Sequence, residues 1–333
     1  MRKLMAIMLG LVLLAGIESC KKQQPSAQPK KITVAVIPKG ATHEYWKAIH
    51  AGAVKAGREL GVDILWKGPL KEDDREAQIQ VVEDIVSRGV SGMVLAPLDD
   101  VALREPVSNA AGAGIPVVII DSPIQSSDYI SFVSTDNYKG GHMAGEYLCK
   151  LLDGKGKLVM LRCHVGSAST TERERGFSEA VKACPGLEVV SDNQYAGVTT
   201  ETAYQVSENL LARFKNPDGS LGIDGIFCPN ESTTFGMLRA LQDGGWAGKI
   251  KFVGFDSSSK LIEALAAGQL DGLILQNPFQ MGYLGVKTIA AYLNKQPFEK
   301  QVDTGETLVT KENMNQPEIK ELLSPDLKKW LNE

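Results

Sequence analysis

The chain carries one pattern twice, and each copy ends an apolar strand on an aspartate. Residues 115–121 (IPVVIID) close the first copy, and residues 250–256 (IKFVGFD) close the second. Each copy begins with three further strand-and-helix units, whose strands are expected near 32–37, 62–66 and 91–96 and near 157–163, 187–191 and 223–228. Short apolar strands that alternate with helices are typical of a parallel sheet covered on both faces. We therefore expect an α/β fold of two doubly wound parallel-sheet lobes.

The two aspartates mark the expected ligand site. Ligands of open α/β sheets bind beyond the carboxyl ends of the strands, so Asp121 and Asp256 should face each other across a cleft. The sequence has no Gly-x-Ser-x-Gly elbow, phosphate loop or histidine-supported nucleophile at a strand end, and its 4 histidines lack metal-ligand spacing. These features predict a binding protein rather than an enzyme, with no cofactor and no metal.

The length and the pattern together predict where the lobes divide. A chain of 333 residues exceeds what one hydrophobic core usually holds. The second copy starts only after Thr135, so the chain should cross between lobes there, and further crossings are expected near Gln276 and Thr304. These three strand-like crossings would form a hinge. The first lobe is then expected to comprise 31–135 and 277–304 and the second 136–276 and 305–333, with one last helix over 317–331.

Charge and composition give no reason to expect a nucleic-acid partner. The chain is 43% hydrophobic and 23% charged, with a net charge of −4 and a sequence pI of 5.7, as is ordinary for a soluble protein. No basic tract or helix-turn-helix segment precedes the first lobe. A small molecule is therefore the expected partner in the cleft.

The first thirty residues have the pattern of an export signal followed by a tether. Arg2 and Lys3 precede an apolar stretch over 4–17, which is too short to span a membrane comfortably. The Ile-Glu-Ser-Cys ending of this signal peptide (1–20) is similar to a bacterial lipoprotein cleavage site, which would make Cys20 the acylated first residue. A plain cleavable signal or a retained anchor is the alternative. Residues 21–30 are polar and contain proline, as expected of a flexible tether from the membrane.

Four cysteines follow Cys20, and an even number in an exported protein favours disulfides. Cys163 should end a strand at the cleft side, whereas Cys184 should end a helix at the opposite side of the sheet, so these two are too far apart to join. A Cys149–Cys184 pair, a Cys163–Cys228 pair and four buried free thiols all remain open.

Seven short motifs, spread over nearly the whole chain, carry a resemblance to a known family. They are Glu44-Tyr45-Trp46, PVVIID at 116–121, Ser134-Thr135-Asp136-Asn137, Arg173-Glu174-Arg175-Gly176, Pro229-Asn230-Glu231, VGFD at 253–256 and Gln276-Asn277-Pro278. From about Lys30 to Glu333 the chain resembles the type I periplasmic binding proteins of sugar ABC importers, the ribose/galactose-type group. These share their fold with the ligand-binding core of lactose-repressor-type regulators.

The resemblance implies a set of ligand contacts, residue by residue. Aromatic rings match the apolar C–H face of a sugar, while Asp, Asn, Gln and Arg match its rim of hydroxyls. Of the two neighbouring arginines, Arg175 is the preferred contact and Arg173 the second candidate. The implied contacts are His43, Tyr45, Trp46, Asp121, Arg173, Arg175, Asn230, Asp256 and Gln276.

Two segments depart from the family pattern, so the sequence does not assign one sugar. Ser122-Pro123 follows the first aspartate where pentose binders tend to have a second arginine, and Gly197-Val198 stands where some relatives have an aromatic ring. Trp66, at the end of the second strand, with Lys67-Gly68-Pro69 and Glu72-Asp73-Asp74 after it, is a candidate for a replacement wall.

The implied function is capture of a monosaccharide-like ligand between the lobes and its delivery to an ABC permease. The protein would act as a monomer at the periplasmic or extracellular face, held to the membrane by lipid on Cys20. The alternative is a sensor-type receptor for a polyol, nucleoside or furanosyl signalling molecule that feeds a membrane signalling partner. An enzyme of the same shape lacks its nucleophile, and a regulator core lacks its DNA-binding headpiece and would not carry an export signal.

Overall fold

Two six-stranded sheets form the framework of the chain. The computed structural model describes residues 31–41 and 43–331, and those from Ile32 onward belong to one compact unit. The predictions for Cys20, the signal segment and the 21–30 tether lie outside the described residues. The first sheet contains β1 (Thr33–Ile37), β2 (Asp63–Trp66), β3 (Gly92–Leu95), β4 (Val117–Ile120), β5 (Ser131–Ser134) and β11 (Gln301–Asp303).

The second sheet repeats the first. It contains β6 (Lys155–Arg162), β7 (Gly186–Tyr195), β8 (Gly225–Phe227), β9 (Lys251–Phe255), β10 (Gly272–Leu275) and β12 (Thr307–Val309). The strand orders are β11-β5-β4-β3-β1-β2 and β12-β10-β9-β8-β6-β7, so β1 to β5 correspond to β6 to β10. The outermost strands differ, since β11 runs parallel to β5 whereas β12 runs antiparallel to β10. The predicted α/β fold with two parallel-sheet lobes is confirmed.

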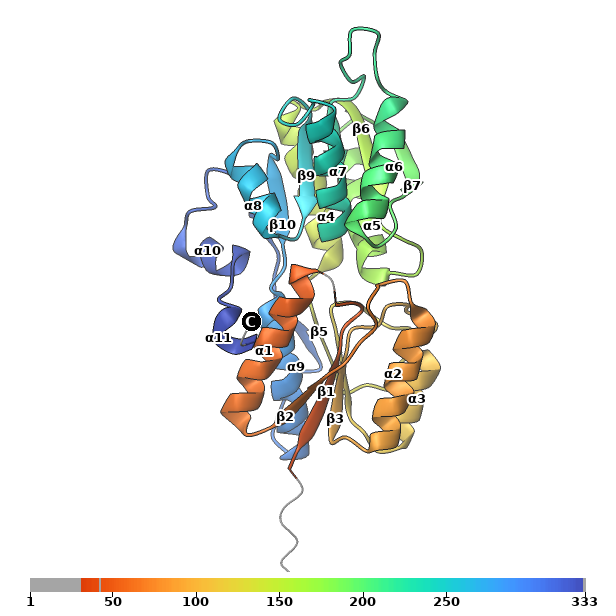
Figure 1. Cartoon of the computed structure of the whole chain (residues 1–333), viewed down its shortest axis with the longest axis vertical. Coiled ribbons are helices and arrows are strands. Elements are labelled where there is room, and N and C mark those ends of the chain that lie inside the picture. Colours follow the sequence, from red (N-terminus) through yellow and green to blue (C-terminus); the bar gives the residue numbers. More distant parts are fainter. Residues whose placement is uncertain (1–30, 42, 332–333) are drawn as a thin grey trace, which may run out of the picture. The chain divides into compact units, whose positions relative to one another are not determined.

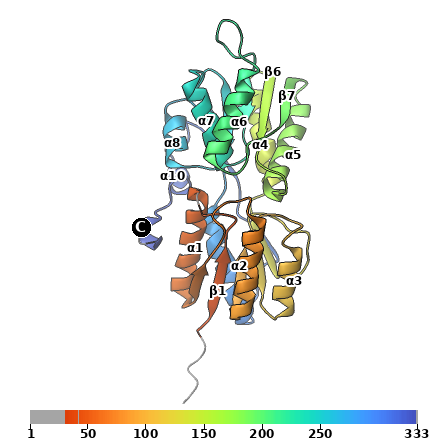
Figure 2. The ribbon, with the colours of Figure 1, turned by 45° about the vertical axis from the view of Figure 1, so that its right-hand side comes forward.

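Helices cover both faces of each sheet (Figure 1). Those on the first sheet are α1 (Glu44–Leu60), α2 (Arg75–Arg88), α3 (Arg104–Gly112) and α9 (Pro278–Leu293). Those on the second are α4 (Asn137–Leu151), α5 (Ala168–Lys182), α6 (Thr200–Ala212), α7 (Glu231–Asp243) and α8 (Ser259–Ala266). Figures 1 and 2 show α1 beside α9 in the first lobe.

Alternating strand residues explain why each sheet needs helices on both faces. In β1, Val34 and Val36 pack with α1 and α9, whereas Ala35 and Ile37 pack with α2 and α3. Successive strand side chains point to opposite faces, so a strand that is apolar throughout must be covered twice. The second lobe is built the same way around two further apolar clusters, one on each face of its sheet.

The end of the chain differs from the prediction. The single helix expected over 317–331 is wrong: the structure has α10 (Pro317–Leu323) and α11 (Lys328–Leu331). Pro325 disfavours a helical conformation at Ser324, which is not helical, with φ −145° and ψ 73°. The chain then returns to the first lobe, where the Arg58 guanidinium donates to the backbone oxygens of Lys329 and Trp330 at 3.3 and 3.0 Å. The predicted boundaries, which assign 305–333 to the second lobe, do not include this contact.

One of the cysteine pairings left open is confirmed. Cys149 and Cys184 form a disulfide with a Cα–Cα distance of 6.4 Å, which joins the ends of the neighbouring helices α4 and α5. Cys163 and Cys228 are buried free thiols. Across 31–41 and 43–331, none of the helices combines the length and the apolar character that crossing a membrane requires.

Candidate functional site

Asp121 and Asp256 occupy equivalent positions, one directly after β4 and the other directly after β9. Both have left-handed backbone conformations, with φ 64° and 66°. Such a conformation costs a non-glycine residue on the order of 1 to 3 kcal/mol and persists where the surroundings hold it, commonly at functional sites. Both side chains are buried, with only 3% and 6% of each residue exposed. The same strained strand end is therefore built once in each lobe.

The two aspartates line one cavity between the lobes, as the sequence predicts. The first lobe contributes Lys39, His43, Tyr45, Trp46, Glu72 and Asp121, and the second contributes Ser167, Ser169, Thr170, Arg173, Asn230, Glu231, Asp256 and Gln276. All the predicted contacts except Arg175 are among them. The cavity is small, with about 30 Å³ of space for the centres of water molecules.

A lysine that the sequence analysis missed pairs with the first-lobe aspartate. Lys39 Nζ lies 2.6 Å from Asp121 Oδ2, and the Tyr45 hydroxyl donates to Asp121 Oδ1 at 2.8 Å. Lys39 thus provides a cation beside the carboxylate in a chain that has Ser122 where relatives tend to have an arginine. Its place just beyond the carboxyl end of β1 was the available signal, since side chains there face the cleft.

Glu72, which the sequence marks only as part of the segment after Trp66, joins two predicted contacts. Its Oε1 accepts from the Trp46 indole Nε1 at 2.6 Å and lies 2.6 Å from His43 Nδ1. Burial alone lowers the pKa of His43, but the charge and hydrogen bond of Glu72 outweigh this effect and raise the pKa to about 9. Burial raises the pKa of Glu72, yet His43 outweighs it and brings that pKa down to about 2. His43 therefore stands in the cleft as an imidazolium.

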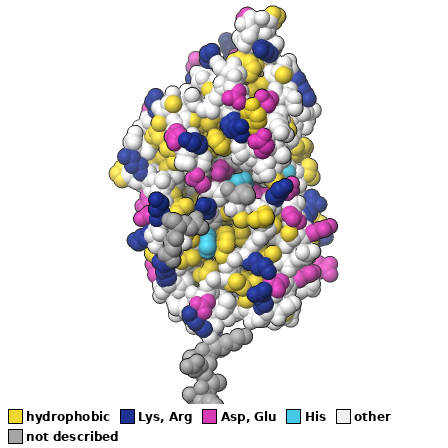
Figure 3. Space-filling model, in the orientation of Figure 1, with side chains coloured by type: hydrophobic (Ala, Val, Ile, Leu, Met, Phe, Trp, Pro, Cys, Tyr) yellow, Lys and Arg dark blue, Asp and Glu magenta, His cyan; other side chains and the backbone are white. Residues whose placement is uncertain are grey.

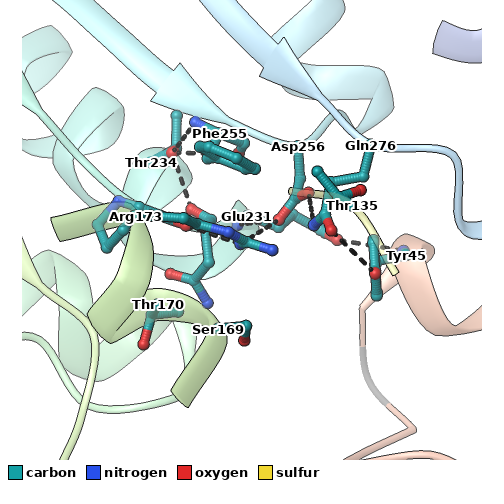
Figure 4. A network of polar contacts seen from close by, with 12 residues as sticks. Tyr45, Thr135, Ser169, Thr170, Arg173, Glu231, Thr234, Phe255, Asp256 and Gln276 are labelled. Atoms are coloured by element: carbon teal, nitrogen blue, oxygen red, sulfur yellow. Dashed lines mark hydrogen bonds and ion pairs between the residues drawn. The ribbon is translucent and has the colours of Figure 1, made fainter. Parts of the chain in front are cut away.

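The second-lobe aspartate has a different set of partners. Asp256 Oδ1 accepts from the Gln276 amide at 2.7 Å, and Oδ2 accepts from the backbone N–H of Glu231 at 3.2 Å. Arg173 Nη1 lies 3.8 Å from the same Oδ2. Burial raises the pKa of Asp256, against the lowering effect of the Arg173 charge and the hydrogen bonds. Figure 4 shows Arg173 reaching toward Asp256 while Tyr45 approaches from α1 on the other side.

Arg173 is held rigidly inside the second lobe. Its Nε donates to Asn137 Oδ1 at 2.8 Å, its Nη1 donates to the Pro229 backbone oxygen at 2.9 Å, and its guanidinium lies 4.0 Å from the Phe255 ring centre. Nη2 is buried and has no hydrogen-bond partner among the described residues. A buried donor without a partner is costly, so this N–H group is available for a ligand oxygen.

The preference for Arg175 over Arg173 is wrong. Arg175 lies on the outer face of α5, where it pairs with Glu172 at 2.6 Å and Glu179 at 3.2 Å. Its side chain is 51% exposed, whereas the Arg173 side chain is 3% exposed. Two positions along a helix differ by about 200°, so only one of the two arginines can face the cleft.

Two other predictions need qualification. Asn230 lines the cavity, but it also caps α7: its Oδ1 accepts from the Thr233 backbone N–H at 3.3 Å and from the Thr233 hydroxyl at 2.7 Å. Trp66 does not line the cavity, because its ring is stacked on His50 at a centroid distance of 4.4 Å. The prediction that Trp66 itself forms a wall is therefore wrong, whereas Glu72 of the segment after it does line the cavity.

Hydrogen bonds connect the two lobes around the cavity. Lys39 Nζ donates to Ser169 Oγ at 3.1 Å, and the Ser169 backbone N–H donates to Ser122 Oγ at 3.0 Å. The Tyr45 hydroxyl lies 3.3 Å from Gln276 Oε1, and the Tyr45 backbone N–H donates to Glu231 Oε2 at 3.3 Å. The lobes are therefore closed on each other at this site.

The cavity contains both signs of charge in near balance. Among the described residues its cations are Lys39, His43 and Arg173, and its carboxyl groups are Glu72, Asp121, Glu231 and Asp256. Burial raises the pKa of Glu231 to about 7, so this group is half ionised at neutral pH. The remaining charges cancel. The arrangement offers many donors and acceptors at a net charge near zero, which suits an uncharged ligand rich in hydroxyls.

Ser257 is not among the residues that line this cavity. Ser257, which follows the second aspartate, donates its hydroxyl to the Leu323 backbone oxygen at 3.2 Å rather than to a base. Within 31–41 and 43–331 no cluster of three or more His, Cys, Asp or Glu side chains is arranged to hold a metal ion.

Comparisons with known proteins agree with this geometry. The model of the periplasmic binding protein domain matches residues 34–297. The D-allose-binding periplasmic protein of Escherichia coli (strain K12) is 29% identical over 261 residues, which cover 76% of this chain and 82% of that protein. A carbohydrate transporter solute binding protein from Agrobacterium radiobacter, solved in complex with D-arabinose, is 35% identical with a TM-score of 0.84, covering 89% of this chain and 100% of that one.

A second solved structure is similar to the same degree. An ABC transporter solute binding protein from Agrobacterium vitis, with bound D-fucose, is 35% identical with a TM-score of 0.81, and the match covers 88% of this chain and 100% of that one. The family match over residues 34–297 includes all the residues that line the cavity. The chain therefore belongs to the family of periplasmic binding proteins, as a solute-binding protein of a transport system and not an enzyme.

Proposed function

We propose that this protein captures an uncharged monosaccharide between its lobes and delivers it to an ABC importer. The observation that carries the proposal is the pair of equivalent aspartates, Asp121 and Asp256, buried on one cavity beside Arg173 and the rings of Tyr45 and Trp46. Carboxylates accept from sugar hydroxyls, the guanidinium donates to ring or hydroxyl oxygens, and aromatic rings contact the C–H face. D-allose, D-arabinose and D-fucose are the ligands named for similar proteins, and they are the first candidates.

The energy for closure comes from hydrogen bonds that exist only when both lobes meet the ligand. In a closed cleft, each hydrogen bond to a charged group contributes roughly 1.5 to 3 kcal/mol, and an unmatched buried group costs a similar amount. A ligand that satisfies both aspartates therefore shifts the open and closed populations toward the closed form. An epimer with one misplaced hydroxyl leaves one of them unmatched.

The remaining parts of the proposal concern location and partners. Export to the periplasm is common to the periplasmic relatives, and we infer anchoring by lipid on Cys20 from its signal-like context in the sequence. We infer a monomer that binds no nucleic acid. Lys/Arg and Asp/Glu side chains are interspersed on the face in Figure 3, with no broad patch of positive charge, which supports the second point.

A thermal-shift panel tests the proposal. The protein is heated with D-arabinose, D-allose, D-ribose, D-fucose, ribitol and D-glucuronate in separate samples. Binding at micromolar affinity raises the unfolding midpoint by mass action, and we expect this with at least one neutral sugar and not with the anionic glucuronate. A response to glucuronate alone, or to none of the neutral sugars, would contradict the proposal.

A further inference from the structure

We propose that Glu72 is a positioning residue of this site: it fixes the indole of Trp46 and holds His43 as an imidazolium, so that the ligand meets a fixed cation there. The inference rests on the proposed function, to which it adds a residue that the sequence motifs do not mark. Glu72 comes from the irregular loop 67–74 between β2 and α2, whereas His43 and Trp46 lie at the start of α1.

The contact geometry is that of a shared acceptor. One oxygen, Oε1 of Glu72, lies 2.6 Å from both the Trp46 indole nitrogen and His43 Nδ1. All three residues are buried and line the cavity. A carboxylate holds two donors more strongly than a neutral amide does, because hydrogen bonds to an ionised acceptor are roughly twice as strong. With Nδ1 bound to Glu72, the second ring N–H of His43 is on Nε2.

The backbone around Glu72 is shaped to bring it this close. A Cβ atom at Gly40 would lie 2.9 Å from Glu72 Cγ and 3.5 Å from the Glu72 backbone nitrogen. Only glycine therefore lets the loop after β1 lie against the loop that carries Glu72. The Ala41 backbone N–H also lies 3.4 Å from the Leu70 backbone oxygen, which connects the same two loops. The placement of Glu72 is thus built into the first lobe.

The charges that face this cluster come from both lobes. Glu231 from α7 and Asp256 after β9 add to the effect of Glu72 and help to raise the pKa of His43 to about 9. Lys39, from the loop after β1, acts together with His43 to lower the pKa of Glu72. His164 and Cys163, from the loop after β6, feel the charge of Glu72 as well. Without Glu72, burial would dominate and favour neutral imidazole at neutral pH.

The decisive experiment is a histidine titration by NMR on the ligand-free protein, with Glu72→Gln as the variant. In the wild-type protein we expect His43 to titrate near pH 9, and in Glu72→Gln below its ordinary value of 6.5. The Trp46 indole N–H signal should exchange faster with solvent in the variant. His43 titrating below pH 7 in the wild type would overturn the inference even if Glu72→Gln failed to fold, and so would an unchanged titration in the variant.

Sugar binding provides the second readout. The affinity for the neutral sugars of the thermal-shift panel is measured from pH 5.5 to 8.5 and expressed as the ratio of Glu72→Gln to wild type, because the Glu231 titration is common to both. At pH 8.5 we expect Glu72→Gln to bind the sugar about tenfold more weakly than the wild type does. At pH 5.5, where the imidazole of the variant regains its proton, the two affinities should become nearly equal. A ratio that does not vary with pH overturns the inference.

The two readouts separate the inference from the proposed function. If no sugar binds but His43 titrates near 9 in a Glu72-dependent way, the proposed function fails and the positioning role stands. If sugars bind and the titration does not depend on Glu72, the inference fails and the proposed function stands. Trp46→Phe serves as a matched control, since it removes the indole donor and should leave the high His43 pKa in place.

Discussion

The two lobes place an aspartate at the same point of the same sheet, yet they surround it differently. Asp121 is held by the Tyr45 hydroxyl from the first turn of α1 and by the Lys39 ammonium from the loop after β1. Asp256 is held by the Gln276 amide and a backbone N–H, with Arg173 farther away at 3.8 Å. The repeated fold therefore fixes where the carboxylates stand, while the loops and helix starts of each lobe decide what stands beside them.

The two lobes also differ in the pKa of a buried glutamate, Glu72 in the first lobe and Glu231 in the second. Burial favours the neutral form of both, but the adjacent imidazolium brings the pKa of Glu72 down to about 2. For Glu231 burial outweighs the lowering effect of the His43 charge and raises the pKa to about 7, with Asp256 and Glu44 adding to the rise. The first-lobe glutamate is thus a permanent anion and the second-lobe glutamate a group that titrates.

The largest expected effect is a loss of stability when Arg173, the buried cation of the second lobe, is replaced. Arg173→Met removes one member of a buried charge pair and leaves Asp256 without its cation, so we expect a loss of about 3 to 5 kcal/mol in the free energy of unfolding. Urea unfolding measures it. Arg175→Met, two positions away on the exposed face of α5, is the matched control and should change stability by less than about 0.5 kcal/mol. Equal effects of the two substitutions would refute the assignment of Arg173 to the cleft.

The next largest effect concerns the disulfide, which stabilises the second lobe. Within the described residues, the disulfide joins Cys149 and Cys184 of the second lobe across a sequence separation of 35. Replacing both cysteines by alanine should cost about 3 to 4 kcal/mol, because a closed loop of that length restricts the unfolded chain. Hydrogen exchange should show the loss mainly in α4 and α5. A reductant should lower the unfolding free energy of the wild type by the same amount and leave the variant unchanged. A wild-type protein whose stability does not respond to the reductant would contradict a stabilising disulfide.

The titrating glutamate predicts a stability difference that depends on pH. A folded-state pKa raised from 4.5 to about 7 means that Glu231 favours the fold while protonated, and this contribution is lost as pH rises through 7. Glu231→Gln cannot ionise, so it should match the wild type near pH 5 and exceed it by about 2 kcal/mol at pH 8.5. Unfolding at both pH values measures this. The exposed Glu263→Gln should show no such change, and a difference that is constant with pH would contradict the assignment.

The smallest effect concerns the contact between the lobes. Ser169→Ala removes the oxygen that accepts from Lys39 across the cleft. One hydrogen bond with a charged donor is lost only in the closed form, so we expect sugar affinity to fall by about 3- to 10-fold through faster dissociation, at unchanged unfolding free energy. Ser178→Ala, on the same helix but bonded to the Glu174 backbone oxygen, is the control. Equal dissociation rates in both variants would show that Lys39 does not secure closure.

The sequence sufficed for the features that depend on local pattern. The order of strands and helices and the pair Asp121 and Asp256 could be predicted, because apolar periodicity marks buried strands and parallel strands end at one edge. Arg173 and Arg175 could not be told apart in this way. Their roles depend on which face of α5 packs against the rest of the second lobe, because the two side chains lie about 200° apart around the helix.

Residues outside regular elements were beyond the sequence analysis. Glu72 lies in an irregular loop, where no periodicity indicates which way a side chain points. Its role depends on the close approach of Gly40, which only the folded structure shows. The break between α10 and α11 was visible in principle, because Pro325 stands inside the helix predicted over 317–331, just after α10 ends.

The most direct test of this account is an electron-density map of the protein crystallised with the sugar that gives the largest thermal shift. We predict that the sugar lies between the lobes, with hydroxyls within about 3 Å of both Asp121 and Asp256 and an oxygen on Arg173 Nη2. A sugar bound elsewhere, or one that contacts only one of the two aspartates, would contradict the central claim.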